Sequence, residues 1–203
     1  MVLVPNNKSQ ALARIGWLKK ELEKDHRLCG DYKVFMRELV AKGYARKVPA
    51  IQMNPKESDA WYIPHHVAYH PHKSGKIRVV FDCSAKFMGL SLNGVLDKGP
   101  DLTNSLVGVL TRFRVDRVAV MADIEAMFYQ VRVADRDSSF LRFLWWDNGN
   151  MAREVQEYQM LVHLFGTISS PARENFALRR TAEDKSHFPP QSGKHREEKL
   201  LCR

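Results

Sequence analysis

Apolar residues recur every three or four positions in two segments near the start of the chain. The first segment predicts a helix that begins near Ser9, with an apolar face of Leu12, Ile15, Leu18 and Leu22. The second predicts a helix from near Asp31 to Gly43, with a face of Tyr32, Phe35, Met36, Leu39 and Val40. Residues 1–48 are therefore expected to form a helical lead-in that carries no recognisable chemistry.

At Trp61 the pattern becomes that of strands. Residues 61–70 and 76–81 are rich in aromatic and β-branched side chains, and residues 71–75 have the composition of a turn, which together predict a hairpin. Asp101 is then expected to cap a helix. Its apolar side would carry Leu102, Leu106, Val109, Leu110 and Phe113.

The second half alternates strands and helices. Residues 117–122 form a short apolar run typical of a strand buried on both faces, and a short helix is expected at 124–129. Strands over 140–146 and 154–160 and a helix from Ser170 to about Asp184 follow. This α+β order is four-fifths of a split βαβ, ferredoxin-like unit, which polymerase palms share with many RNA-binding domains.

Charge narrows the choice of partner. A formal net charge of +9 and an isoelectric point near 9.6 favour a polyanion: nucleic acid first, an acidic membrane surface second. A protein that is merely basic remains an alternative. The cysteines Cys29, Cys83 and Cys202 are far apart and favour a reducing compartment. With neither a signal peptide nor a long apolar run, the chain is expected to be intracellular, in the cytoplasm or nucleus.

Asp123 is the first candidate for chemistry, because it follows the apolar run of 117–122 directly. Nucleotidyl transfer uses two metal ions about 3.5–4 Å apart, held by carboxylates. A rigid strand that ends at an exposed aspartate suits this task. A helix-capping role for Asp123 is the competing interpretation.

Seven sequence blocks then occur in a recognisable order. They are WYIPHH (61–66), KIRVVFDCSAK (76–86), SLN (91–93), GPDL (99–102), ADIEAMF (122–128), FLRFLW (140–145) and FGTISSP (165–171). This series resembles the reverse transcriptase of BEL/Pao-type LTR retrotransposons and covers about residues 12–189. The resemblance implies reverse-transcriptase-like fingers over 49–116 and an incomplete palm over 117–185. The polar and charged composition of residues 186–203, with Pro189, Pro190 and Gly193, predicts a disordered tail.

The resemblance also implies roles for single residues. Asp123 matches the first catalytic aspartate, a ligand of two Mg²⁺ ions, and the carbonyl of Ile124 would be a main-chain ligand. Phe128 matches the aromatic gate that selects dNTPs, although a core aromatic is the alternative. Gly166 would lie under the nascent base pair. Phe165 stands where retroviral enzymes have glutamine, which we interpret as a difference between groups.

The basic residues of the hairpin would contact phosphates. Arg78 matches the fingers arginine that grips the incoming triphosphate, since a guanidinium forms paired hydrogen bonds with phosphate oxygens. Lys73 is the expected second phosphate contact, with an ordinary turn lysine as the alternative. Lys76 and Lys86 are expected to contact nucleic acid. Asp82 is expected to orient Arg78 or to cap the turn.

Four histidines lie close together in this region: His65, His66, His70 and His72. Zinc binding would need a further ligand, and neither a cysteine nor an acidic residue lies nearby. We expect them to be edge residues on a hairpin that faces nucleic acid.

The family's next landmark is an aromatic-x-Asp-Asp hairpin, and these 203 residues contain no adjacent pair of aspartates. The sequence therefore predicts a truncated RNA-directed DNA polymerase, inactive by itself, with weak or absent Mg²⁺ binding. Its partners would be an RNA or DNA template-primer and dNTP, and the thumb, RNase H and protease are missing from it. The alternative is a non-catalytic remnant that binds nucleic acid through the basic fingers.

Overall fold

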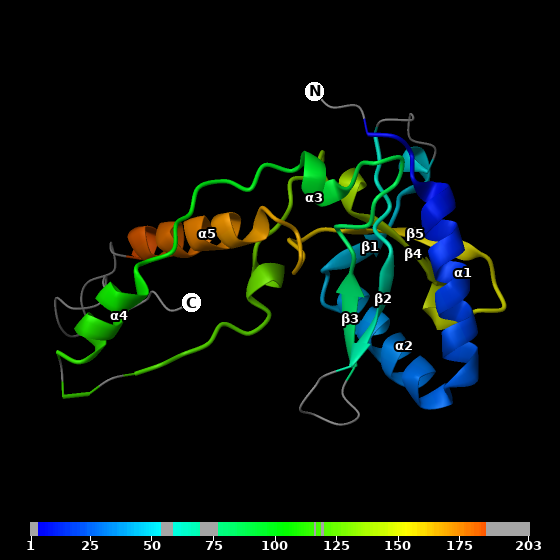
Figure 1. The fold of residues 1–203 in the computed structure, drawn as a ribbon. Coiled ribbons are helices and arrows are strands. Elements are labelled where there is room, and N and C mark those ends of the chain that lie inside the picture. Colours follow the sequence, from blue (N-terminus) through cyan, green and yellow to red (C-terminus); the bar gives the residue numbers. More distant parts are fainter. Residues whose placement is uncertain (1–3, 54–58, 70–76, 116, 119, 186–203) are drawn as a thin grey trace.

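The computed structural model describes residues 4–53, 59–69, 77–115, 117–118 and 120–185. Its helices are α1 (Lys8–Lys24), α2 (His26–Ala41), α3 (Leu92–Val95), α4 (Leu106–Phe113) and α5 (Ser170–Lys185). Its strands are β1 (Ala45–Lys47), β2 (His65–Tyr69), β3 (Ile77–Phe81), β4 (Arg142–Trp146) and β5 (Val155–Met160). Short 3₁₀ turns include η2 (Met127–Gln130) and η3 (Ser138–Leu141). The predicted α+β class is confirmed (Figure 1).

The strands form two antiparallel sheets. One has three strands in the order β1-β5-β4, and the other is the β2–β3 hairpin. The predicted hairpin is confirmed, with Val67 opposite Val79, and the two later predicted strands also pair, with Leu144 opposite Glu157. Strand β1, which pairs with β5, was not predicted because three residues are too short to show a period.

Helices α1 and α2 are confirmed, but both begin earlier than predicted. Helix α1 follows Asn7, whose side chain exchanges two hydrogen bonds of 2.7 Å with the backbone N–H and C=O of Tyr62. Helix α2 begins at His26, because the Asp25 carboxylate accepts a hydrogen bond from the Leu28 amide at 3.0 Å. Of the predicted apolar face of α1, Ile15, Leu18 and Leu22 are buried, whereas Leu12 is 45% exposed.

One hydrophobic core joins these helices to both sheets. His65 lies inside it, so its expected place at a nucleic-acid-facing edge was wrong. Its Nε2 lies 2.8 Å from the Leu144 carbonyl, which can only accept, so Nε2 carries the proton. The Tyr32 hydroxyl then donates to Nδ1 at 2.6 Å. His66 is exposed.

A buried ion pair crosses the β4–β5 hairpin. The Arg142 guanidinium lies 2.9 Å from the Glu157 carboxylate, and Arg142 is 1% exposed. The Tyr62 hydroxyl donates to the same carboxylate at 2.8 Å, and Lys8 of α1 lies 2.6 Å from its second oxygen. This network joins the start of the chain to the three-stranded sheet.

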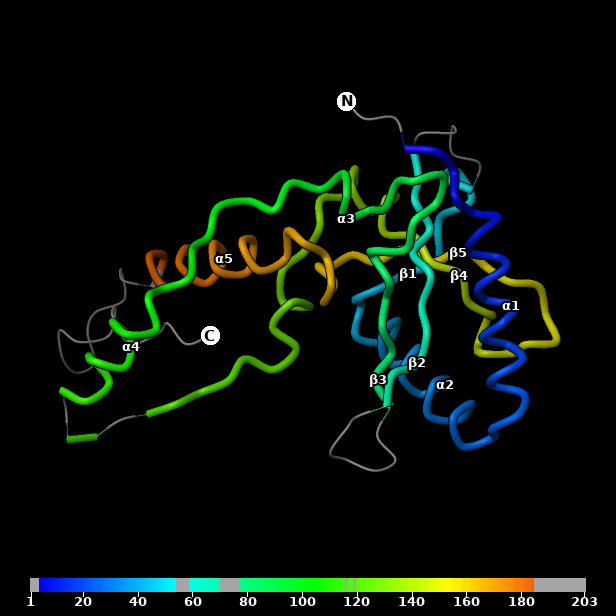
Figure 2. The backbone as a smooth tube through the Cα atoms, viewed as in Figure 1, coloured from blue at the N-terminus to red at the C-terminus, as the bar shows by residue number. Residues whose placement is uncertain are grey.

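The predicted strand over 117–122 is absent from the described residues, which is a correction. Val118, Val120 and Met121 lie outside any strand and are 75–81% exposed. Helix α4 lies far from both sheets, and the chain after it runs back towards them (Figure 2). An apolar run forms a strand only where a neighbouring strand takes its backbone hydrogen bonds, and among the described residues none lies beside it.

Helix α4 also departs from the prediction. It begins at Leu106 after Ser105, and Asp101 instead accepts hydrogen bonds from the amide and hydroxyl of Thr103. Its apolar side chains are not buried: Leu106 is 70% exposed. Within the described part of the chain, no helix is both long and apolar enough to span a bilayer.

Candidate functional site

Arg78, Phe165 and Phe128 meet at one place, although they are far apart in the sequence. The Arg78 guanidinium lies 6.0 Å from the centre of the Phe165 ring. The edge of one ring meets the face of the other between Phe128 and Phe165, with centroids 5.5 Å apart. A guanidinium over an aromatic face is held in position while its N–H groups stay free for an anion. The structure thus unites two of the predicted dNTP-binding residues.

A polar brace holds the Gly166 turn against the end of β3. Asn93 Nδ2 donates to the Gly166 carbonyl at 2.8 Å, and Asn93 Oδ1 accepts from the Ile168 amide at 2.9 Å. The backbone N–H of Asn93 donates to the Cys83 carbonyl at 3.0 Å. Gly166 has a φ of +105°, a conformation that side-chain-bearing residues rarely adopt, and a Cβ there would lie 3.6 Å from the Phe81 carbonyl oxygen. The predicted blocks 76–86, 91–93 and 165–171 therefore converge.

Asp123 and Ile124 do not occupy the predicted strand end. Asp123 is exposed, and its carboxylate accepts a hydrogen bond from the adjacent Ile124 amide at 3.0 Å. Phe128, five residues after Asp123, does contact the aromatic cluster, through the Phe165 ring. The buried-strand setting that would fix the Asp123 carboxylate is not found among the described residues.

The described residues do not make a two-metal centre. No group of three or more His, Cys, Asp or Glu side chains among them lies close enough to hold a metal ion. Asp123 alone cannot hold two divalent cations against their mutual repulsion and hydration. We therefore derive no step through Mg²⁺ from these residues.

The remaining predicted residues have varied positions. Asp82 caps the turn after β3 by accepting from the Ser84 amide at 3.1 Å, and it faces Arg14 at 3.7 Å. Capping was one of its two predicted roles. Lys86 is exposed, and its carbonyl accepts from Gln10 of α1. Lys73, Lys76, His70 and His72 lie outside the described residues.

Sequence reasoning missed two members of this site. Asn93 was part of a recognised block but had no assigned role, although an amide can bridge two backbone groups as it does here. Phe165 was interpreted only as a group difference, whereas its ring contacts both Arg78 and Phe128. The signal for Phe165 was its place directly before the glycine of the block.

Helix α5 carries a buried carboxyl group, that of Glu174. It is 2% exposed, and its Oε1 has no hydrogen-bond partner among the described residues. Burial raises the pKa of Glu174 from 4.5 to about 7. Burial has the opposite effect on two histidines, and it lowers the pKa of His65 and of His163 from 6.5 to about 4.

We expect Glu174→Gln to stabilise the chain above pH 7. A raised carboxyl pKa means that the folded state holds a proton that the unfolded state has lost, so Glu174 reduces stability as the pH rises from 4.5 to 7. The gain at pH 8 is at most about 3 kcal/mol, at 1.36 kcal/mol per pKa unit. Urea unfolding at pH 8 and pH 4.5 measures it.

The same substitution should steepen the loss of stability in acid. The depressed pKa values of His65 and His163 make the fold lose stability as the pH falls from 6.5 towards 4, and Glu174 opposes this change. The control is the exposed Glu154→Gln, which should leave the pH profile unchanged. An equal effect of Glu174→Gln at both pH values would contradict the assignment.

Comparison with models of known protein families found no match for this chain. A comparison with curated protein sequences found none either.

Proposed function

We propose that this chain is the fingers and the first part of the palm of a BEL/Pao-type reverse transcriptase, and that it binds the triphosphate of a dNTP beside a template-primer. One observation carries the proposal: Arg78, Phe165 and Phe128 converge at a turn that Asn93 fixes. These residues belong to four of the seven ordered blocks. A random basic protein has no reason to bring those blocks together.

The chemistry of the cluster suits a nucleotide. The Arg78 side chain is on the exposed face of the β2–β3 hairpin, opposite Ala68, and its guanidinium can form forked hydrogen bonds with phosphate oxygens. Phe165 is 61% exposed and offers an aromatic face beside this cation. Phe128 contacts the Phe165 ring at one side of the cluster, and we propose it as the gate against a 2′-hydroxyl.

Arg78→Ala tests this proposal. Hydrogen bonds to charged groups contribute about 1.5–3 kcal/mol, so we expect dNTP affinity to fall about 10- to 100-fold. Fluorescence anisotropy of a labelled dNTP measures it. The control is Arg136→Ala, which removes the same charge from a side chain that is 87% exposed and lies outside the cluster. Equal losses in the two variants would show that only net charge matters.

A second candidate is a remnant that binds nucleic acid without any nucleotide site. The net charge of +9 favours it, because such binding rests on phosphate neutralisation. It predicts that nucleic-acid affinity falls steeply with salt, and that the slope of log affinity against log salt changes by about one unit for each lost phosphate contact. It also predicts that Arg78→Ala and Arg136→Ala have the same effect on dNTP affinity. Gel shifts at two salt concentrations, run beside the anisotropy titration, separate the two candidates.

A further inference from the structure

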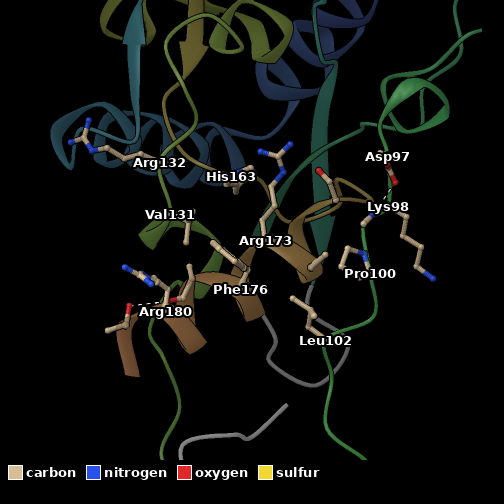
Figure 3. A pocket seen from close by; sticks show the side chains of 15 residues that line it. Asp97, Lys98, Pro100, Leu102, Val131, Arg132, His163, Arg173, Phe176 and Arg180 are labelled. Atoms are coloured by element: carbon tan, nitrogen blue, oxygen red, sulfur yellow. Dashed lines mark hydrogen bonds between the residues drawn. The ribbon is translucent and has the colours of Figure 1, made fainter. Parts of the chain in front are cut away.

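A hollow lies beside α5 and shares no lining residue with the Arg78 cluster. Its volume is about 710 Å³, within the range of small-molecule sites. It lies between α5, the loop of residues 97–102 and the segment that carries Val131 and Arg132, with His163 at one side (Figure 3).

Two contacts hold the walls of this hollow together. Gly99 has a φ of +74°, and a Cβ there would lie only 2.9 Å from the Cβ of Ala172, so the loop approaches α5 as closely as a glycine permits. Arg179 of α5 donates from Nη2 to the Leu102 carbonyl at 2.6 Å. The loop is therefore fixed to the helix at both ends of the hollow.

Helix α5 presents an alternation of basic and aromatic side chains to this hollow. Arg173, Phe176 and Arg180 line it, and their spacing of three and four residues places them on one face of the helix. The Phe176 ring is 64% exposed, although it lies among the apolar lining residues Leu102, Val131, Ala172 and Ala177. An exposed ring between two arginines is a platform on which a flat heterocycle can stack.

The charge around the hollow is strongly positive. Lys98, Arg132, Arg173 and Arg180 line it, against the single carboxylate of Asp97. Lys98 and Arg180 flank the hollow on opposite sides (Figure 3). Arg132 and Arg173 form no salt bridge with any residue that the structure describes. Arg180 does pair with Glu183 and Asp184 at 3.6 and 3.3 Å, but exposed pairs of this kind contribute little.

His163 adds a neutral polar group. Burial, and then the charge of Arg173, lower the pKa of His163 to about 4. At neutral pH its ring therefore carries one N–H donor and one acceptor. Such a group can bond to a base edge or a phosphate without adding a charge.

We propose that this hollow binds a nucleotide, with its base stacked on Phe176 and its phosphate beside Arg173. The cationic lining favours an anionic ligand, and the single exposed ring suits one base at a time. The nucleotide has two sources: a free mononucleotide, or one unit of a single strand. The inference does not rest on the Arg78 cluster.

Fluorescence titrations with 2-aminopurine compounds test the proposal. The ligands are 2-aminopurine deoxyriboside monophosphate, the nucleoside without phosphate, and a short single-stranded oligonucleotide with one 2-aminopurine. We expect Phe176→Ala to weaken binding about 5- to 100-fold, because base stacking contributes about 1–3 kcal/mol. Phe176→Leu, which keeps an apolar side chain, should lose affinity as well. Arg136→Ala should leave binding intact, because this 87% exposed side chain lines neither the hollow nor the Arg78 cluster.

Each outcome bears on the proposal. Binding of the monophosphate points to a free nucleotide, and binding of the oligonucleotide alone points to a single strand; either supports the site if Phe176→Ala removes it. Equal binding of the nucleoside would overturn the phosphate contact. Unchanged affinity in Phe176→Ala, or a loss in Arg136→Ala of the same size, would overturn the site. Since Phe176 is exposed, circular dichroism of the variant should match that of the parent chain.

Discussion

Glu157→Ala is expected to lower the free energy of unfolding by about 3–5 kcal/mol. Arg142 is 1% exposed, and the substitution removes the carboxylate that pairs with its guanidinium. It also removes the acceptor of the Tyr62 hydroxyl hydrogen bond. Burial, followed by the hydrogen bond to Glu157, raises the pKa of Tyr62 to about 12. A buried charge without a partner costs more than the pair contributes, so the single substitution is worse than the loss of both partners. Urea unfolding followed by tryptophan fluorescence measures the change.

The matched control is Glu154→Ala, which removes an exposed carboxylate just before β5. It should change the free energy of unfolding by less than about 0.5 kcal/mol. A double variant, Glu157→Leu with Arg142→Met, should recover much of the loss, because apolar residues of similar size often replace a buried pair without cost. A loss below about 1 kcal/mol for Glu157→Ala would contradict the assigned network.

Periodicity predicted the elements whose partners are close in sequence. Helices α1 and α2 bury Ile15, Leu18, Tyr32 and Met36 as their spacing indicated, and both hairpins pair across short connections. It did not predict helix starts, because Asn7 bonds to Tyr62, 55 residues away, and not to its own helix. It also gave no sign that Arg142, in an apolar block, would find Glu157 across the sheet.

The candidate site was predictable in its members but not in its geometry. The blocks named Arg78, Phe128 and Gly166, and the structure brings them together through Phe165 and Asn93. Asp123 was placed at a strand end because the residues before it are apolar. An apolar run indicates only that a segment tends to be buried. The segments that would bury it can be distant in the sequence, and the run does not identify them.

We expect the purified 203-residue chain to extend no annealed primer in the presence of Mg²⁺ and dNTPs. In-line transfer needs two metal ions between several carboxylates, and the exposed Asp123 has no such partners among the described residues. A single carboxylate in water also leaves the ions fully hydrated. Product should therefore stay at the level of a no-enzyme control in a gel-based primer-extension assay.

Nucleotide binding and catalysis depend on different residues, Arg78 and Phe165 for binding and Asp123 for catalysis. Arg78 and Phe165 are held by the packed β2–β3 hairpin and the Asn93 brace, so nucleotide affinity should be measurable even without turnover. Asp123→Asn should then leave both the background extension and dNTP binding unchanged. Extension above background that Asp123→Asn abolishes would show that this exposed carboxylate does gather metal ions, and the requirement for further carboxylates would be wrong.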